Sequence, residues 1–171
     1  IQRINKSYMF EYAEYAFWGN PMVLENSNEA YLQQLFYNCL SPSDCEDLVC
    51  LYLYDKANYI AIPSTNKIAT ELYECVLVNP SNGKLAYPQV KKGRDNLNIN
   101  DYMELIKDNP NKEVYLFTTE GKLQGDIHIN NIHGISPYEL YNWTEEKIKN
   151  NSFLIPEGIV KWYKLIHSSE K

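Results

Sequence analysis

The sequence predicts one α/β domain of mixed α+β character, with a small mixed sheet that helices cover on both faces. Three observations predict this class. An apolar stripe at helical spacing follows Asp44, strand-like segments flank the turn dipeptide Asn82-Gly83, and two helix-forming segments close the chain. The expected core order is helix, strand, strand, strand, helix, strand.

The N-terminal part of the chain is predicted to form an arm followed by two helices, the second of which is the first helix of the core. Residues 1–25 are aromatic and irregular, and we expect them to form an arm packed on the core. Asn28 is a suitable N-cap for a helix over 29–37. The second helix, from Asp44 to about Asp55, is predicted by a stripe at helical spacing made of Cys45, Leu48, Val49, Tyr52 and Leu53.

The strands come next. Apolar and β-branched runs predict strands over 59–62, 71–78, 84–92 and 113–119, and a helix over 100–108 separates the last two. A short hairpin is expected around Glu120-Gly121, leading through Leu123 to Ile132. Two helices then close the chain, over 137–150 behind the capping pattern Ser136-Pro137-Tyr138-Glu139 and over 156–166.

The predicted organisation is a single domain, 1–171. It divides into an N-terminal arm and helix (1–40), a core (41–120) and a C-terminal hairpin with helices (121–171). Hydrophobic residues make up 44% and charged residues 22%, which is typical of a globular chain and not of a disordered one. The net charge of −6 argues against an isolated, strongly basic nucleic-acid binder.

The sequence also indicates a compartment. No signal peptide and no apolar run near 18 residues is present, so we expect a cytoplasmic protein without membrane association. The four cysteines, Cys39, Cys45, Cys50 and Cys75, show no CxxC pair and no metal-ligand spacing, and are expected to be reduced thiols. His128 and His133 lack zinc spacing and a third ligand nearby in sequence.

The predicted hairpin places polar side chains together. If Asn82 and Gly83 form a two-residue type I′ turn, Val78 faces Tyr87, Val76 faces Gln89, and Glu74 faces Lys91. Alternation puts these six on one face, apolar near the turn and polar at the far end. A carboxylate, an amide and an ammonium thus converge where the strands leave the core.

Two simpler interpretations of this pattern stay open. Glu74 and Lys91 would form a cross-strand salt bridge, which stabilises by roughly 0.2–1 kcal/mol. Pro88 cannot donate to a ladder and is typical of an edge strand or a bulge, and a bulge there would shift the pairing beyond it by one residue.

Glu74 followed by Gln89-Val90-Lys91 after a hairpin, with an acidic helix before them, resembles the PD-(D/E)xK nuclease superfamily in its Mrr-like QxK form. The resemblance covers about residues 44–117 and implies a restriction-endonuclease-like fold. It implies that Glu74 and Gln89 hold Mg²⁺ or Mn²⁺, and that Lys91 positions or activates the attacking water. A glutamate on the preceding helix often completes such a site.

That helix offers Glu46 and Asp47. Glu46 borders the apolar stripe whereas Asp47 points away from it, so we favour Glu46 as a further metal ligand. The alternative is that Glu46 only caps its own helix, because Ser43-Asp44-Cys45-Glu46 is itself a capping-box pattern. The chain departs from the family pattern in three ways: the strand acid is glutamate, Pro88 precedes the motif, and the motif contributes no carboxylate.

The function expected from this resemblance is metal-dependent hydrolysis of DNA phosphodiester bonds, in prokaryotic restriction, defence or repair. Another domain or subunit, a homodimer partner included, would help to bind the DNA. The basic cluster Lys91-Lys92-Gly93-Arg94 is either a solvated turn or a phosphate contact. The rival hypothesis is a non-catalytic protein-binding module, such as an immunity or regulatory partner, or a nuclease fold that has lost activity.

Overall fold

A computed structural model describes residues 26–62, 75–107, 109–125, 129 and 131–168. The predicted N-terminal arm lies outside these residues. The helices are α2 (Asn26–Leu32), the π-helical η1 (Gln33–Cys39), α3 (Pro42–Ala57), the 3₁₀ helix η3 (Ile99–Tyr102), α4 (Met103–Ile106), α5 (Pro137–Lys149) and α6 (Glu157–Ser168). The strands are β1 (Ile60–Ala61), β2 (Leu77–Val78), β3 (Leu85–Lys91), β4 (Leu97–Asn98), β5 (Lys112–Thr118), β6 (Leu123–Gln124) and β7 (Ile132–Gly134).

The main sheet is mixed, and its strand order is β1-β2-β3-β5-β7. The first three strands are antiparallel neighbours, whereas β5 runs parallel to β3 and β7 runs parallel to β5. Apart from β4 and η3, which lie between β3 and α4, the chain order α3, β1, β2, β3, α4, β5 follows the predicted helix, strand, strand, strand, helix, strand. The predicted mixed α/β class is therefore confirmed.

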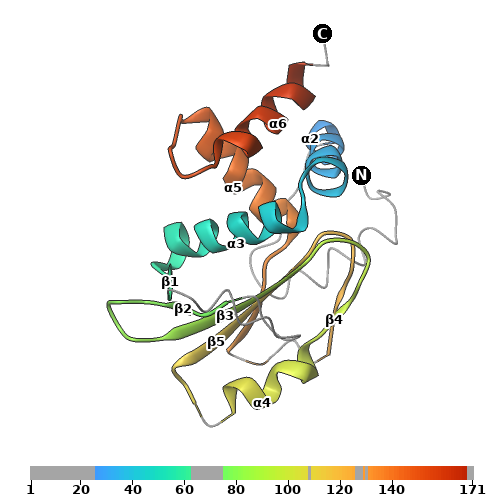
Figure 1. The fold of residues 1–171 in the computed structure, drawn as a ribbon. Coiled ribbons are helices and arrows are strands. Elements are labelled where there is room, and N and C mark those ends of the chain that lie inside the picture. Colours follow the sequence, from blue (N-terminus) through green and yellow to red (C-terminus); the bar gives the residue numbers. More distant parts are fainter. Residues whose placement is uncertain (1–25, 63–74, 108, 126–128, 130, 169–171) are drawn as a thin grey trace.

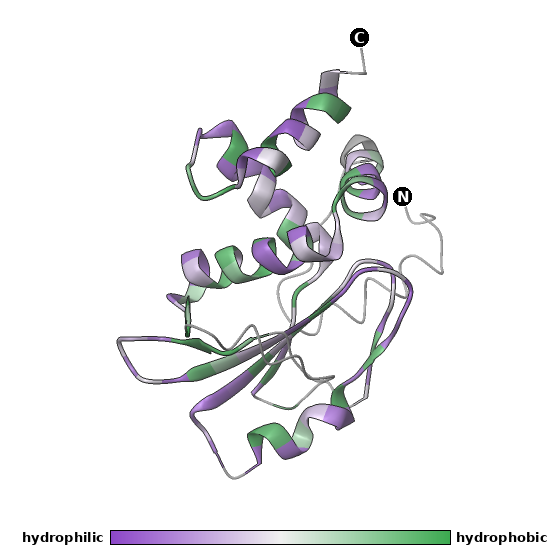
Figure 2. Cartoon of the chain, viewed as in Figure 1, coloured by the Kyte–Doolittle hydropathy of each residue, from purple (hydrophilic) through white to green (hydrophobic). Residues whose placement is uncertain are grey.

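Helices α2, α3, α5 and α6 all lie on one side of the sheet, with α3 nearest to the strands and α6 farthest from them (Figure 1). Apolar residues of α3 alternate with hydrophilic ones along that helix (Figure 2), and the buried ones share a core with Ala86 and Val90 of β3. Phe36 lies 5.9 Å from Phe117 and 6.4 Å from Tyr141 between ring centroids, which joins η1, β5 and α5. This core contains, among others, Cys45, Leu48, Val49, Leu53, Leu77, Ala86, Val90, Leu140 and Tyr163.

The other face carries α4 and a separate two-stranded sheet (Figure 1). Strands β4 and β6 are parallel and pair Leu97 with Leu123. The second core formed here contains Tyr87, Leu97, Ile99, Tyr102, Val114, Leu116, Leu123 and Ile132. The prediction that both sheet faces are covered is confirmed, and β3 is accordingly buried at every position from Ala86 to Val90.

Helix α3 begins two residues before the predicted start. Ser41 is its N-cap and accepts a hydrogen bond from the Asp44 N–H (3.1 Å), while the Asp44 carboxylate accepts one from the Ser41 N–H (3.0 Å). Pro42 occupies the first helical turn, where a missing N–H costs nothing. The capping box is thus formed by Ser41 and Asp44, and not by Ser43 and Glu46 as in the alternative interpretation of Glu46.

The predicted two-residue turn at Asn82-Gly83 is also wrong. Leu77 pairs with Ala86 and Val78 with Leu85, so the register differs by two from the predicted one. Gly83 has φ 75°, but the described non-glycine residues with positive φ are Asn58 and Asn151, so Asn82 does not complete a type I′ turn. Asn79 closes a longer loop instead: its N–H bonds the Lys84 carbonyl (2.9 Å) and its side chain accepts from the Ser81 N–H (2.8 Å).

The shift by two keeps the predicted faces. Because side chains alternate with a period of two, Tyr87, Gln89 and Lys91 still share one face of β3, as predicted, whereas Ala86 and Val90 share the other. The predicted partner, Glu74, lies outside the described residues, and so does its pairing with Lys91.

Pro88 lies in β3, an inner strand of the sheet, and no bulge forms there. The Leu85 N–H bonds the Asn111 carbonyl (2.8 Å) and the Thr119 N–H bonds the Lys91 carbonyl (3.1 Å), so odd-numbered residues of β3 direct their backbone groups toward β5. Backbone groups alternate between neighbours, and Pro88 therefore has its nitrogen on the β2 side. The described β2–β3 ladder ends at Ala86, and the β3–β5 ladder continues through Pro88 without a bulge.

No hairpin forms at Glu120-Gly121, which corrects the prediction for 120–132. The chain after β5 enters β6, which pairs in parallel with β4, and then β7, which pairs in parallel with β5. The strands that flank Glu120-Gly121 are therefore not partners: β5 belongs to the main sheet, and β6 pairs with β4 in the separate two-stranded sheet.

Polar contacts attach α5 to α3. Ser136 caps α5 by accepting the Glu139 N–H (3.0 Å), as predicted, and the Glu139 carboxylate accepts a hydrogen bond from the Tyr52 hydroxyl. The Trp143 indole N–H donates to Asp55 (2.8 Å). All four cysteines lie within the described residues, and none forms a disulfide, as predicted. None of the described helices has the length and apolar character needed to cross a bilayer.

The position of the α3 cap is testable. Ser41→Ala should lower the free energy of unfolding by about 1 kcal/mol, because it removes the acceptor of the Asp44 N–H. Ser43→Ala is the matched control and should change it by less than about 0.5 kcal/mol. Urea denaturation of both variants measures the difference, and the reverse ranking would contradict the observed cap.

Candidate functional site

The C-terminal end of β3 carries the polar residues of the QxK motif. Gln89 pairs in register with Leu116, and Lys91 with Thr118, so both side chains lie on the face of the second core, the α4 side. Gln89 is 1% exposed, and Lys91 is half-buried. The strand thus changes from apolar side chains to a buried amide and then to an ammonium as it leaves the core.

The segment after Lys91 is a basic turn, residues 92–94, attached to the end of β5. The Gly93 N–H donates to the Thr119 hydroxyl oxygen (2.8 Å), and the Glu120 N–H donates to the Gly93 carbonyl (3.0 Å). Gly93 has φ 120°, which a side chain would disfavour. Arg94 is 90% exposed, and its Nε lies 3.4 Å from Glu120 Oε1. A cation is therefore presented to solvent beside the end of β3.

Lys92 lies on the other side of the strand. Burial raises the pKa of the Cys45 thiol to about 12, and the nearby Lys92 ammonium opposes this rise. The pKa of the Cys39 thiol is also raised by burial, and Lys92 opposes that rise as well. This electrostatic effect places Lys92 near the start of α3. Lys91 and Lys92 thus extend to opposite faces of the sheet, as alternation along a strand requires.

The structure separates Glu46 from the QxK residues. Glu46 is half-buried and Asp47 is exposed, as the helical wheel predicts. However, α3 packs on the face that carries Ala86 and Val90, whereas Gln89 and Lys91 extend from the opposite face. Of the four predicted site residues, two lie together, Glu46 lies on the other side of the sheet, and Glu74 lies outside the described residues.

Metal ligands are few in the part of the chain that the structure describes. Among residues 26–62, 75–107, 109–125, 129 and 131–168, no three His, Cys, Asp or Glu side chains form a group that could hold a metal ion. Of the predicted metal ligands, Gln89 is the one that lies both within the described residues and on the same face as Lys91, and its amide oxygen would be the coordinating atom. Such an oxygen is of the hard, neutral kind that Mg²⁺ accepts.

A second polar cluster at the opposite end of β5 was not predicted. Glu113 Oε1 lies 2.6 Å from His133 Nε2, and Glu113 Oε2 lies 3.5 Å from Lys84 Nζ. Tyr115 stacks on the His133 ring, with centroids 4.8 Å apart, and its hydroxyl donates to Glu113 (3.4 Å). The hydrogen bond from His133 is the main cause of a lowered pKa of the Glu113 carboxyl, which burial opposes and Lys84 assists.

Sequence reasoning considered His133 only with His128, which lies outside the described residues. The contact of Glu113 with His133 depends on the parallel pairing of β5 with β7, which sets Tyr115 opposite His133. No local signal in the sequence gives that register. The nearest available signal was the occurrence of a carboxylate, a tyrosine and a histidine at the ends of strand-like runs.

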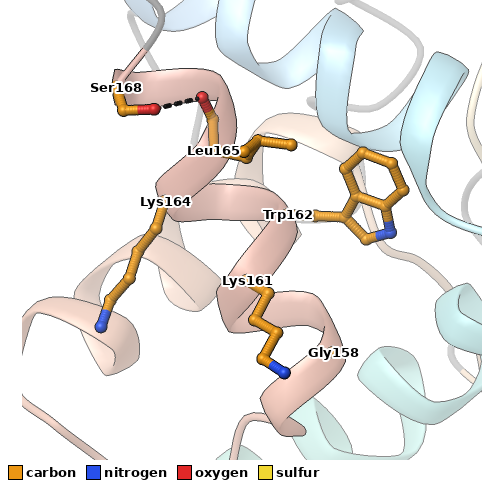
Figure 3. A pocket seen from close by; sticks show the side chains of 6 residues that line it. All are labelled: Gly158, Lys161, Trp162, Lys164, Leu165 and Ser168. Carbon is orange, nitrogen blue, oxygen red and sulfur yellow. Dashed lines mark hydrogen bonds between the residues drawn. The ribbon is translucent and has the colours of Figure 1, made fainter.

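The outer side of α6 presents an open depression lined by Gly158, Lys161, Trp162, Lys164, Leu165 and Ser168 (Figure 3). Trp162 is 41% exposed and Leu165 is 59% exposed, although both are large apolar side chains. The opposite side of the same helix buries Ile159, Tyr163 and Ile166 in the core. Helix α6 is therefore apolar on two sides, one of which faces outward.

Comparison with known proteins gives no further information: no family model, curated protein or solved structure matches the chain.

The pKa of Glu113 leads to a pH-dependent stability. A carboxyl with a lowered pKa stabilises the fold above its unfolded-state pKa, and this stabilisation is lost as the pH falls through the lowered value. Glu113→Gln should therefore lower the free energy of unfolding by about 1–2 kcal/mol near pH 7. The difference from wild type should shrink as the pH falls below about 4.3 and vanish once the pH is below the lowered pKa of the Glu113 carboxyl. Denaturation between pH 3 and pH 7 measures it. Glu104→Gln, at an 84% exposed side chain, is the control and should show no such trend.

Proposed function

We propose that this chain is a metal-dependent nuclease domain that hydrolyses DNA phosphodiester bonds. One observation carries the proposal: Gln89 and Lys91 extend from the same face at the end of a central strand. That strand is the third in the order helix, three strands, helix, strand that the nuclease resemblance implies. The exposed Arg94 beside it supports contact with an anionic backbone.

The residues of the chain have separate roles in this proposal. The Lys91 ammonium stabilises the negative charge that develops on the phosphate as water attacks phosphorus, and it can donate a hydrogen bond to that water. Arg94 binds a neighbouring phosphate. Glu74 and the Gln89 amide oxygen would hold Mg²⁺ or Mn²⁺, which when bound polarises a phosphoryl oxygen and lowers the pKa of water.

The charge of the chain bears on how DNA would be bound. The net charge of −6 opposes approach to DNA, so local cations on the turn after β3 must act against a repulsive field. Another domain or subunit, a second copy of this chain included, would then supply much of the affinity. We place the activity in prokaryotic restriction, defence or repair on the strength of the resemblance alone.

Cleavage of plasmid DNA tests the proposal. Lys91→Ala should reduce Mg²⁺- or Mn²⁺-dependent cleavage on the order of 10²-fold or more, because the ammonium acts on charge that develops in the transition state. Its stability should fall by no more than about 1 kcal/mol, because the half-buried side chain lies at the end of the strand. Lys112→Ala is the matched control, since it removes the same charge at the far end of the β3–β5 pair.

Two outcomes would contradict the proposal. Equal cleavage by wild type and Lys91→Ala would remove Lys91 from the chemistry. A wild-type protein that cleaves neither DNA nor RNA with Mg²⁺ or Mn²⁺, alone or fused to a general DNA-binding domain, would favour the second candidate function.

The second candidate is a non-catalytic protein-binding module, and the outward face of α6 favours it. Exposed large apolar side chains on one helix side are typical of interaction surfaces. Here Trp162 and Leu165 lie one turn apart, and Lys161 and Lys164 line the same depression, the Lys164 side chain extending away from the Trp162 ring (Figure 3).

Adjacent residues of α6 test whether this face is open. Trp162→Ser should lower the free energy of unfolding by less than about 1 kcal/mol, whereas Tyr163→Ser, at a 6% exposed position, should lower it by about 3 kcal/mol or more. Urea denaturation gives both values. A loss above about 2 kcal/mol for Trp162→Ser would mean that another part of the chain covers this face, and the binding-module candidate would lose its support.

A further inference from the structure

We propose that Thr118 and Thr119, at the end of β5, are positioning residues for Lys91 and the basic turn that follows it. The inference rests on the proposed nuclease function and extends it to residues that the QxK motif does not include. Both threonines are buried, at 0% and 2% exposure, although each carries a hydroxyl group. A buried hydroxyl is costly unless it forms hydrogen bonds, so the bonds it forms indicate its role.

Thr119 binds the chain directly after Lys91. Its backbone N–H donates to the Lys91 carbonyl (3.1 Å), and its hydroxyl oxygen accepts the Gly93 N–H (2.8 Å). The first bond continues the parallel ladder, whereas the second one involves a side chain and lies beyond the end of β3. The hydroxyl of Thr119 therefore holds the turn where strand pairing has stopped.

Thr118 holds the second half of the same turn. It lies opposite Lys91 in the β3–β5 register, on the same side of the sheet. Its hydroxyl hydrogen can be donated to the Asp95 carbonyl (3.2 Å) or the Gly93 carbonyl (3.4 Å), and its oxygen accepts the Gly121 N–H (3.1 Å). One buried hydroxyl thus connects the loop after β3 with the loop after β5.

The close approach of these two loops requires a glycine. A Cβ placed on Gly121 would lie 2.0 Å from the Asp95 carbonyl oxygen and 2.9 Å from Thr118 Oγ1. Further along, the Lys122 N–H donates to the Asn96 side chain (2.8 Å), and the Leu97 N–H donates to the Lys122 carbonyl (2.9 Å). Residues 91–97 are consequently bound along their length to residues 118–122.

This arrangement has a consequence for the chemistry. A lysine side chain is flexible, and the place of its ammonium depends on how well the backbone that carries it is held. Displacement of a reacting group by about 1 Å can reduce a rate on the order of 10²-fold. The threonine hydroxyls touch neither substrate nor metal in this proposal, and act only through the backbone at Lys91 and Gly93.

The test compares three substitutions of buried threonines. Thr119→Val keeps the side-chain volume but removes the acceptor of the Gly93 N–H, and Thr119→Ser keeps the acceptor. Thr144→Val is the matched control: Thr144 is 0% exposed in α5, and its hydroxyl donates to the Leu140 carbonyl (2.8 Å), far along the chain from β3. Each Val variant should lower Tm by a similar amount, about 2–4 °C.

We expect Thr119→Val to lower kcat for metal-dependent DNA cleavage at least tenfold with KM changed less than threefold, well below its Tm. Thr119→Ser should restore kcat to within about twofold of wild type, and Thr144→Val should leave it unchanged. Hydrogen exchange of the Gly93 amide should accelerate at least tenfold in Thr119→Val only.

Unchanged kcat in Thr119→Val, or an equal loss in Thr144→Val, would overturn the positioning role while the nuclease proposal stands. An inert wild type would instead overturn the nuclease proposal, and the positioning role with it. The Gly93 exchange rate then decides separately whether the Thr119 hydroxyl holds the turn: unchanged exchange in Thr119→Val would show that it does not.

Discussion

The parallel pairing of β3 with β5 is the interaction on which the rest of the structure depends. Seven residue pairs, from Leu85–Lys112 to Lys91–Thr118, run in register without a bulge. This ladder sets which side chains face each core, because paired residues of parallel strands extend to the same side. It also brings the end of β3 beside the end of β5, so that the basic turn can bind to buried threonines.

Burial on both faces of the sheet makes the polar residues of β3 informative. Apolar side chains would satisfy either core, yet Gln89 is 1% exposed in the centre of the sheet. Burial of an amide side chain destabilises the fold unless hydrogen bonds or a bound ligand replace the water that the amide loses. Lys91, two residues further on, reaches the margin of the same core. The change from apolar to polar side chains along this face of β3 is the reason for proposing the active site at this end of the sheet.

The two polar ends of the sheet differ in how their charges are balanced. Glu113 is already paired with His133 and Lys84, and its lowered pKa reflects those contacts. Such a cluster has the properties of a structural ion-pair network. The Lys91 end has a half-buried ammonium and a 90% exposed Arg94, whose pairing with Glu120 is solvent-exposed and therefore weak. Of the two, the Lys91 end is better suited to bind an external anion.

Strand faces were predictable from the sequence, whereas pairings were not. The alternation of Ala86, Tyr87, Gln89 and Val90 determined which side chains share a face, and an error of two residues in the register left this unchanged. The register depended on Asn79, whose side chain and backbone close a longer loop than Asn82-Gly83 alone indicates. The turn preference of Asn82-Gly83 was therefore not sufficient to fix the register, because loop length and register are set together.

The sequence by itself determined the class of the fold, the order of its core elements and the shared face of Gln89 and Lys91, because periodicity and alternation are local properties. Only the tertiary structure decided that α3 covers the opposite face and so separates Glu46 from Lys91. It alone brought Thr118 and Thr119 to Lys91, and His133 to Glu113. Those contacts join residues 20 or more positions apart through parallel strands, whose register no local turn specifies.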